Sequence, residues 1–155
     1  MKKLWGFALL CCFLVHSVGL AAVGSHNTSY VGGTIVSLKQ GVEGTSSTQG
    51  EKYFVFKYKE GTLSIPYDHI NDLEYGQKAG RRLGLALTIS PWLLLSKKRR
   101  HYLTIGYTDE NDKQQAGVFE LGKDVVRVTL ASLEARTGKK IDYQDEEARK
   151  SGLGN

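Results

Sequence analysis

Cysteine is nearly absent from this 155-residue sequence, which has only Cys11 and Cys12, both near its start. Two cysteines cannot form the dense disulfide framework of a small secreted scaffold. If the segment that holds them is removed, the remaining chain has none. Disulfides, thiol catalysis, zinc-thiolate sites and iron–sulfur clusters are then excluded. The hydrophobic fraction of 41% predicts a folded core, and the length predicts one ordinary domain.

Motifs of catalysis and cofactor binding are also missing. The histidines beyond the first segment are His26, His69 and His101, and none has an HExxH or HxH partner. No serine lies in a nucleophile-elbow context, and no glycine-rich loop has the setting that cradles phosphates. Asp68 and His69, with Asp72 and Glu74, form the one compact acid/base cluster, which we interpret as a polar corner between strands. The sequence therefore predicts no enzyme, no metal and no cofactor, and a hydrolase using Asp68 and His69 is the distant alternative.

The first residues have the order of a secretory signal peptide. Lys2 and Lys3 precede an apolar run over residues 4–20, and small residues follow it. We expect residues 1–24 to be a signal peptide, cleaved near Ala21, Ala22 or Gly24. The alternative is an uncleaved anchor, although the run is short for a span of about 20 residues. The expected location is secreted or periplasmic, with peripheral membrane association.

From residue 30 the chain reads as short strands separated by turns. Strands are expected at residues 30–38, 52–59, 62–65, 70–75, 101–108 and 116–121, and residues 39–50 are expected to form a mobile loop. A helix follows, because apolar positions recur with helical spacing between a capping Asp124 and a terminating Gly138. The residues that share its apolar face are Val126, Thr129, Leu130 and Leu133. Residues 142–155 are expected to be a flexible charged tail that frays.

Strands followed by one amphipathic helix are a definite pattern, because the helix must bury its apolar face against the sheet. The sequence segments that carry a resemblance are IPYDHI at 65–70, LTI at 103–105, FEL at 119–121 and LEARTG at 133–138. On these segments the chain resembles the bacterial PH-like or GRAM-like superfold. The resemblance implies a mainly β fold over residues 30–141, a bent antiparallel β-barrel capped by one amphipathic helix. It does not choose a function, because lipid binders, peptide binders and structural modules share this architecture.

Acidic residues are absent between Glu74 and Asp109, where the chain carries seven lysines and arginines. Outside this segment, and not counting Lys2 and Lys3, the chain has 12 basic residues against 16 acidic ones. The formal charge of +5 therefore conceals a mildly acidic body with one strongly basic segment. We treat residues 77–100 as an insert in the fold.

Within this insert, residues 83–95 (LGLALTISPWLLL) have no charge. They are too few to span a bilayer as a helix, and Pro91 interrupts one. Trp92 is of a type enriched at membrane interfaces. We therefore expect a non-enzymatic binding module that contacts an anionic lipid surface or another envelope component. The predicted contact residues are Arg81, Arg82, Trp92, Lys97, Lys98, Arg99 and Arg100.

The alternative is a structural or protein-interaction module whose insert packs on the barrel or on another protein. Nucleic acid is the other partner that a basic run indicates, since aromatic side chains near basic ones can stack on bases. An exported chain does not meet cytosolic nucleic acid, so we predict none.

Overall fold

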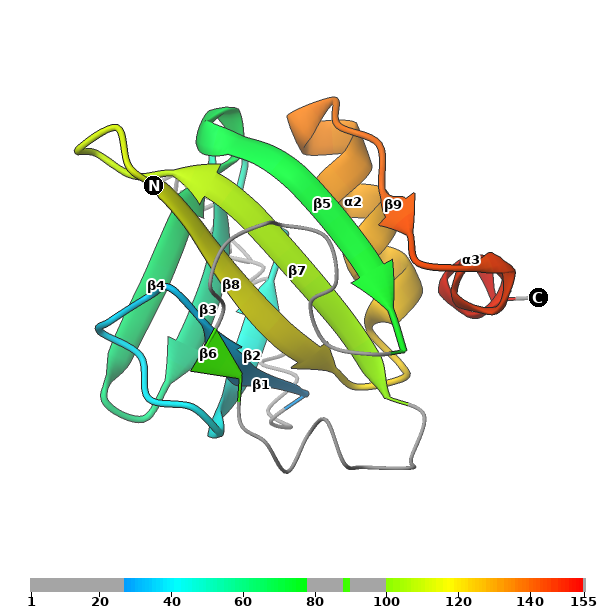
Figure 1. The fold of residues 1–155 in the computed structure, drawn as a ribbon, viewed down its shortest axis with the longest axis horizontal. Coiled ribbons are helices and arrows are strands. Elements are labelled where there is room, and N and C mark those ends of the chain that lie inside the picture. Colours follow the sequence, from blue (N-terminus) through cyan, green and yellow to red (C-terminus); the bar gives the residue numbers. More distant parts are fainter. Residues whose placement is uncertain (1–26, 78–87, 90–99, 155) are drawn as a thin grey trace, which may run out of the picture.

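The computed structural model describes residues 27–77, 88–89 and 100–154, and its strands form one sheet (Figure 1). The strands are β1 (Thr28–Gly33), β2 (Val42–Ser47), β3 (Tyr53–Tyr58), β4 (Gly61–Pro66), β5 (Ile70–Gly76), β6 (Thr88–Ile89), β7 (His101–Thr108), β8 (Gln114–Leu121) and β9 (Asp142–Tyr143). Their order is β4-β3-β2-β1-β8-β7-β5-β9, with β6 beside β1. The pairings are antiparallel except that of β5 with β9, so the sheet is mixed.

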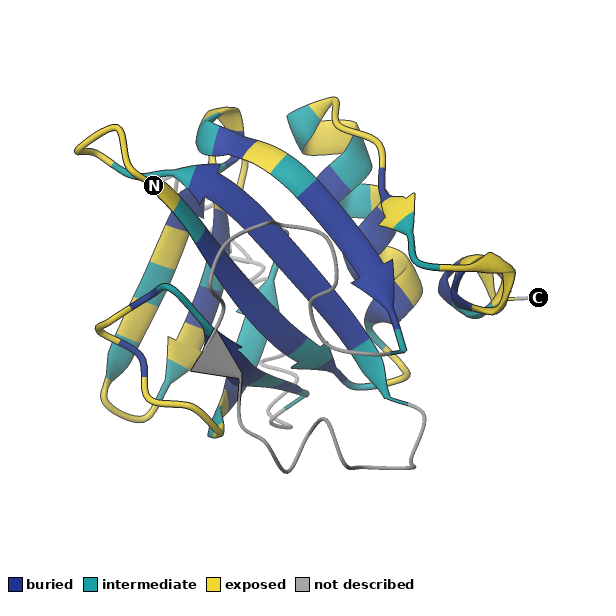
Figure 2. Ribbon diagram, in the orientation of Figure 1, coloured by how far each residue is buried: buried dark blue, intermediate teal, exposed yellow. Residues whose placement is uncertain are grey.

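Alternation of side chains explains the strands that were predicted from sequence. In β3, Phe54 and Phe56 are fully buried, whereas Tyr53 and Lys57 are exposed. This period of two is what a half-buried pleated strand requires. β7 is buried along most of its length because it lies between β5 and β8 inside the sheet (Figure 2).

The expectation of a mobile loop at residues 39–50 is wrong, because β2 lies there between β1 and β3. Close packing against the neighbouring strands explains why this segment is rich in glycine and hydroxyl residues. A Cβ at Gly44 would lie 2.2 Å from the carbonyl oxygen of Lys57, so only glycine fits this close approach. The Ser46 hydroxyl is hydrogen-bonded to that of Thr28 at 2.6 Å. Glycine and small hydroxyl residues in this segment therefore serve sheet packing.

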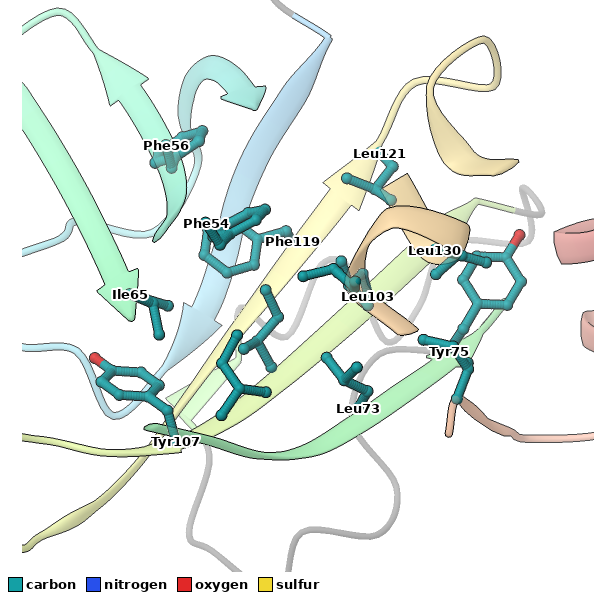
Figure 3. Packing of buried hydrophobic residues seen from close by; sticks show 14 of the residues in the cluster. Phe54, Phe56, Ile65, Leu73, Tyr75, Leu103, Tyr107, Phe119, Leu121 and Leu130 are labelled. Atoms are coloured by element: carbon teal, nitrogen blue, oxygen red, sulfur yellow. The ribbon is translucent and has the colours of Figure 1, made fainter. Parts of the chain in front are cut away.

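The sheet bends around a single core (Figure 3). Phe54 lies on β3 and Phe119 on β8, with β2 and β1 between those strands. Three steps across a flat sheet would separate the two strands by about 14 Å. Their ring centroids are 5.3 Å apart, so the sheet curls enough to bring side chains from these two strands into contact. Phe56 also packs on Phe119, at 5.4 Å.

The predicted helix is α2 (Val126–Thr137), and the four residues predicted to share its apolar face are its buried residues. Leu130 of this helix lies beside Tyr75 of β5 in the core (Figure 3). Gly138 ends it with a left-handed backbone, as expected. The prediction that Asp124 caps it is wrong. The residue before the helix is Val125, and no side chain caps its first turn.

The polar corner between β4 and β5 is a short 3₁₀ helix, η1 (Tyr67–His69). His69 Nδ1 is hydrogen-bonded to the carbonyl oxygen of Thr108, 3.1 Å away at the end of β7. His69 therefore ties the corner to the sheet, in agreement with its interpretation as a structural residue.

The C-terminal segment differs from the frayed tail expected at residues 142–155. It contains β9 and a second helix, α3 (Glu146–Leu153), capped by Asp145, whose carboxylate accepts a hydrogen bond from the backbone N–H of Ala148 at 2.7 Å. Ala148 and Gly152 are buried on one side of α3. Because these two small residues are four positions apart, they share one face of α3 and let the helix approach the core closely. The segment has few apolar residues, so this pattern was not recognised in the sequence.

The expectation of a mainly β chain with a C-terminal helix is confirmed, and the described residues contain two α-helices where one was expected. In the described part of the chain, β4 and β9 at the two ends of the sheet are not paired with each other, so a closed barrel is not formed there. No helix in this part has the length and apolar character needed to cross a membrane.

Candidate functional site

Most of the contact residues predicted from the sequence lie outside the described residues. These are Arg81, Arg82, Trp92, Lys97, Lys98 and Arg99. The expected signal peptide, residues 1–24, also lies outside them. Arg100 is the predicted contact residue that the structure describes.

Arg100 is engaged within the protein. Its Nη1 lies 2.9 Å and 2.6 Å from the two carboxylate oxygens of Glu120 on β8. The same hydrogen bonds and the charge of Glu120 raise the pKa of Arg100. Because both side chains are partly exposed, the pair contributes modestly to stability. Its main consequence is that Glu120 already balances the charge of Arg100, the residue before β7.

The two ends of the insert meet at one end of the sheet. β5 precedes the insert and β7 follows it, and Gly76 is paired with Tyr102 across these strands. Within the insert, β6 pairs with Gly32 and Gly33 of β1. The backbone at residues 88–89 is therefore joined to the sheet.

A hollow of about 600 Å³ lies where the insert leaves and rejoins the sheet. We call it the basic hollow. Its lining residues are Gln77, His101, Lys123, Val126, Arg127, Glu147, Lys150, Ser151 and Gly154. They come from the residue after β5, the start of β7, the turn between β8 and α2, the first turn of α2, and α3 with the residue after it, so the fold assembles the hollow from distant parts of the sequence.

Among the described residues, three cations and one carboxylate line this hollow. Within the described residues, no ion pair engages the three cations, Lys123, Arg127 and Lys150. Arg127 lies close over Gly154, where a Cβ would be 2.6 Å from its guanidinium. Glu147 is the carboxylate among these described lining residues. With neutral histidine, their formal charge is three positive minus one negative, or +2.

A hydrogen-bonded cluster forms the wall of the hollow at His101. The Tyr75 hydroxyl lies 2.5 Å from His101 Nδ1 and 3.4 Å from Ser151 Oγ. The rings of Tyr75 and His101 are stacked with centroids 6.2 Å apart. These contacts join β5, β7 and α3 at the edge of the hollow.

The directions of the pKa shifts of Tyr75 and His101 indicate which groups of this cluster carry protons. Burial raises the pKa of Tyr75, so its hydroxyl keeps its proton at neutral pH. Burial and the nearby charge of Lys123 lower the pKa of His101, which favours the neutral ring. We assign the Tyr75 hydroxyl as donor to Nδ1, its nearest acceptor, which places the imidazole proton on Nε2. Ser151 Oγ is 3.5 Å from Nδ1, too far for an activated nucleophile.

The chemistry offered by the hollow is binding of anions through lysine, arginine, hydroxyl and amide donors. Among the described residues, no three His, Cys, Asp or Glu side chains gather as they would around a metal ion. Sequence reasoning placed the basic surface in the insert at residues 77–100 and did not identify Lys123, Arg127 or Lys150. A local signal was the spacing of Lys123 and Arg127, four residues apart on either side of the first residue of α2.

Comparison with known proteins adds no assignment. No protein-family model matches the chain, and no curated protein sequence matches it.

Proposed function

We propose that the chain is an exported, non-enzymatic binding module of PH-like architecture that contacts an anionic membrane surface through its basic and apolar insert, residues 77–100. The observation that carries this proposal is the position of the basic hollow. Its cations lie at the same end of the sheet as Gln77 and Arg100, the two ends of the insert. Arg100 at the end of the insert, Lys123 after β8, Arg127 of α2 and Lys150 of α3 thus lie at one end of the sheet.

The curvature of the sheet supports the architecture in this proposal. Phe54 and Phe119 meet across the core, and α2 buries its apolar residues in the same core. A bent antiparallel barrel capped by a helix is what the resemblance implies. The antiparallel run from β4 to β5 with α2 following β8 is compatible with that architecture.

The electrostatic part of the proposal follows from the insert sequence. Each basic residue near an anionic leaflet contributes about 1 kcal/mol to attraction, and this contribution falls within a Debye length. Lys97, Lys98 and Arg99 are better test positions than Arg100, because reversing Arg100 would also break its pair with Glu120.

Vesicle co-sedimentation tests the proposal with residues 25–155, which include the whole described fold. Vesicles of neutral phosphatidylcholine are compared with vesicles that also contain phosphatidylglycerol. Binding should require the anionic lipid, weaken with salt and fall when Lys97, Lys98 and Arg99 are changed to Glu. Lys139 and Lys140 changed to Glu serve as control, because they follow α2 at its other end. Equal binding to neutral and anionic vesicles would contradict the electrostatic contact.

The alternative function is a structural or protein-interaction module with the insert packed on the sheet or on another protein. The pairing of β6 with β1 favours it for the middle of the insert. In that case Trp92 fluorescence should be shielded from a soluble quencher in the absence of lipid. In the membrane-contact function, shielding should appear only when anionic vesicles are added.

A further inference from the structure

We propose that the basic hollow is a binding site for a phosphomonoester group. Every residue named for the site is described by the structure, and the inference does not depend on a membrane contact by the insert. Three properties of the hollow support it: the charge, the donors and the size.

Charge selects an anion with more than one negative charge. Lys123, Arg127 and Lys150 give the lining three positive charges, and Glu147 supplies one negative charge. A phosphomonoester carries about −1.5 to −2 at neutral pH, which balances the lining, whereas a carboxylate or a phosphodiester carries one charge.

The donors of the hollow come from different elements and suit a group with several oxygens. Lys123 precedes α2, Arg127 lies in its first turn, and Lys150 and Ser151 come from α3. The first turn of α2 has no acidic residue and no capping side chain to compete for its backbone N–H groups. Donors from two elements can thus approach several oxygens of one phosphate group.

Size indicates that phosphate is one part of a larger molecule. A hollow of about 600 Å³ lies within the range of small-molecule sites, and a bare phosphate would fill only a fraction of it. Gln77, Val126 and the His101 ring add both polar and apolar surface to the lining, beside the charged groups. A phosphorylated lipid headgroup and a soluble phosphate ester share this chemistry.

Inorganic phosphate is the first probe, titrated into residues 25–155 while the His101 ring signal is followed by NMR. Sulfate and chloride at matched ionic strength report nonspecific charge effects. Saturable binding of phosphate should shift the His101 signal. The double variant Lys123→Gln/Lys150→Gln should weaken binding by about tenfold or more, because each lost lysine removes a charge-assisted hydrogen bond.

The matched control is Lys139→Gln/Lys140→Gln, which removes the same charge from exposed positions beyond the other end of α2. It should bind phosphate within about twofold of the unchanged chain, since distant exposed charges contribute little. Equal weakening in both double variants, or an absence of saturable binding, would overturn the site. Because Lys123 and Lys150 are exposed, both variants should keep the unchanged far-UV circular dichroism spectrum.

Vesicles distinguish the two sources of the phosphate group. With a lipid source, vesicles containing phosphatidic acid should bind the chain more tightly than phosphatidylglycerol vesicles of equal charge, and Lys123→Gln/Lys150→Gln should remove the difference. With a soluble source, glycerol 3-phosphate should bind and the two vesicles should not differ. Loss of vesicle binding on changing Lys97, Lys98 and Arg99, with phosphate binding unchanged, would separate this site from the contact proposed for the insert.

Discussion

A double-mutant cycle on Phe54 and Phe119 tests the curvature of the sheet directly. The two rings touch with centroids 5.3 Å apart and an interplanar angle of 61°, an edge-to-face arrangement. Such pairs contribute about 0.5–1.5 kcal/mol beyond the area that they bury. Changing either residue to Leu should lower the free energy of unfolding by about 1–3 kcal/mol. The double variant should lose less than the sum, by about 0.5–1.5 kcal/mol.

The measurement is urea unfolding followed by far-UV circular dichroism, with the coupling energy taken from the four chains of the cycle. The reference cycle combines Phe54→Leu with Val128→Ala, because Val128 is 66% exposed on α2 and should not couple to Phe54. Additive losses for Phe54 and Phe119 would mean that β3 and β8 do not meet across the core. The bent sheet, and the PH-like architecture proposed from it, would then be refuted.

Four further outcomes are expected. Gly33→Ala should cost at least about 2 kcal/mol, because its φ is +142° and a Cβ would lie 2.1 Å from the Ala116 carbonyl oxygen. Gly41→Ala, with open space but φ +80°, should cost only about 1 kcal/mol in the same urea unfolding. The lowered pKa of His101 means that the unfolded chain binds its proton more readily, so stability should fall as pH decreases below the ordinary value of 6.5. His101→Gln should flatten this dependence in thermal melts at a series of pH values. Ala148→Asp should cost about 3 kcal/mol or more, because it buries an unpaired charge, and a smaller loss would mean that α3 is not packed on the core.

Local periodicity made much of the fold predictable. The alternation in β3 and the spacing of Val126, Leu130 and Leu133 each depend on neighbouring residues, and both elements were found where expected. β2 was missed because its glycine and hydroxyl residues satisfy contacts supplied by β1 and β3, and composition alone makes such a segment look like a loop. α3 was missed for a related reason, since Ala148 and Gly152 bury little area and gain their meaning only from the surface they approach.

The basic hollow could not be predicted, because its residues are far apart in the sequence. His101 meets Tyr75 and Ser151, which are 26 and 50 residues away, so no spacing rule could have joined them. The insert predicted from the charge pattern lies in the sequence between β5 and β7, and the hollow lies where these two strands meet it. The charge pattern of the sequence indicated residues 77–100, whereas Lys123 and Lys150 could be identified only from the three-dimensional structure.

The pairing of β9 with β5 protects the chain from association with other copies through this strand edge. An uncovered strand edge is a template for pairing with other chains. Here Tyr143 lies beside Tyr75 of β5, and Gln144 covers Gly76 while its side-chain amide donates to Glu74 at 2.9 Å. Residues 142–144, which follow α2 in the sequence, thus protect an edge of β5, a strand formed by much earlier residues. Proteolytic removal of these residues would leave that edge open to association with other copies.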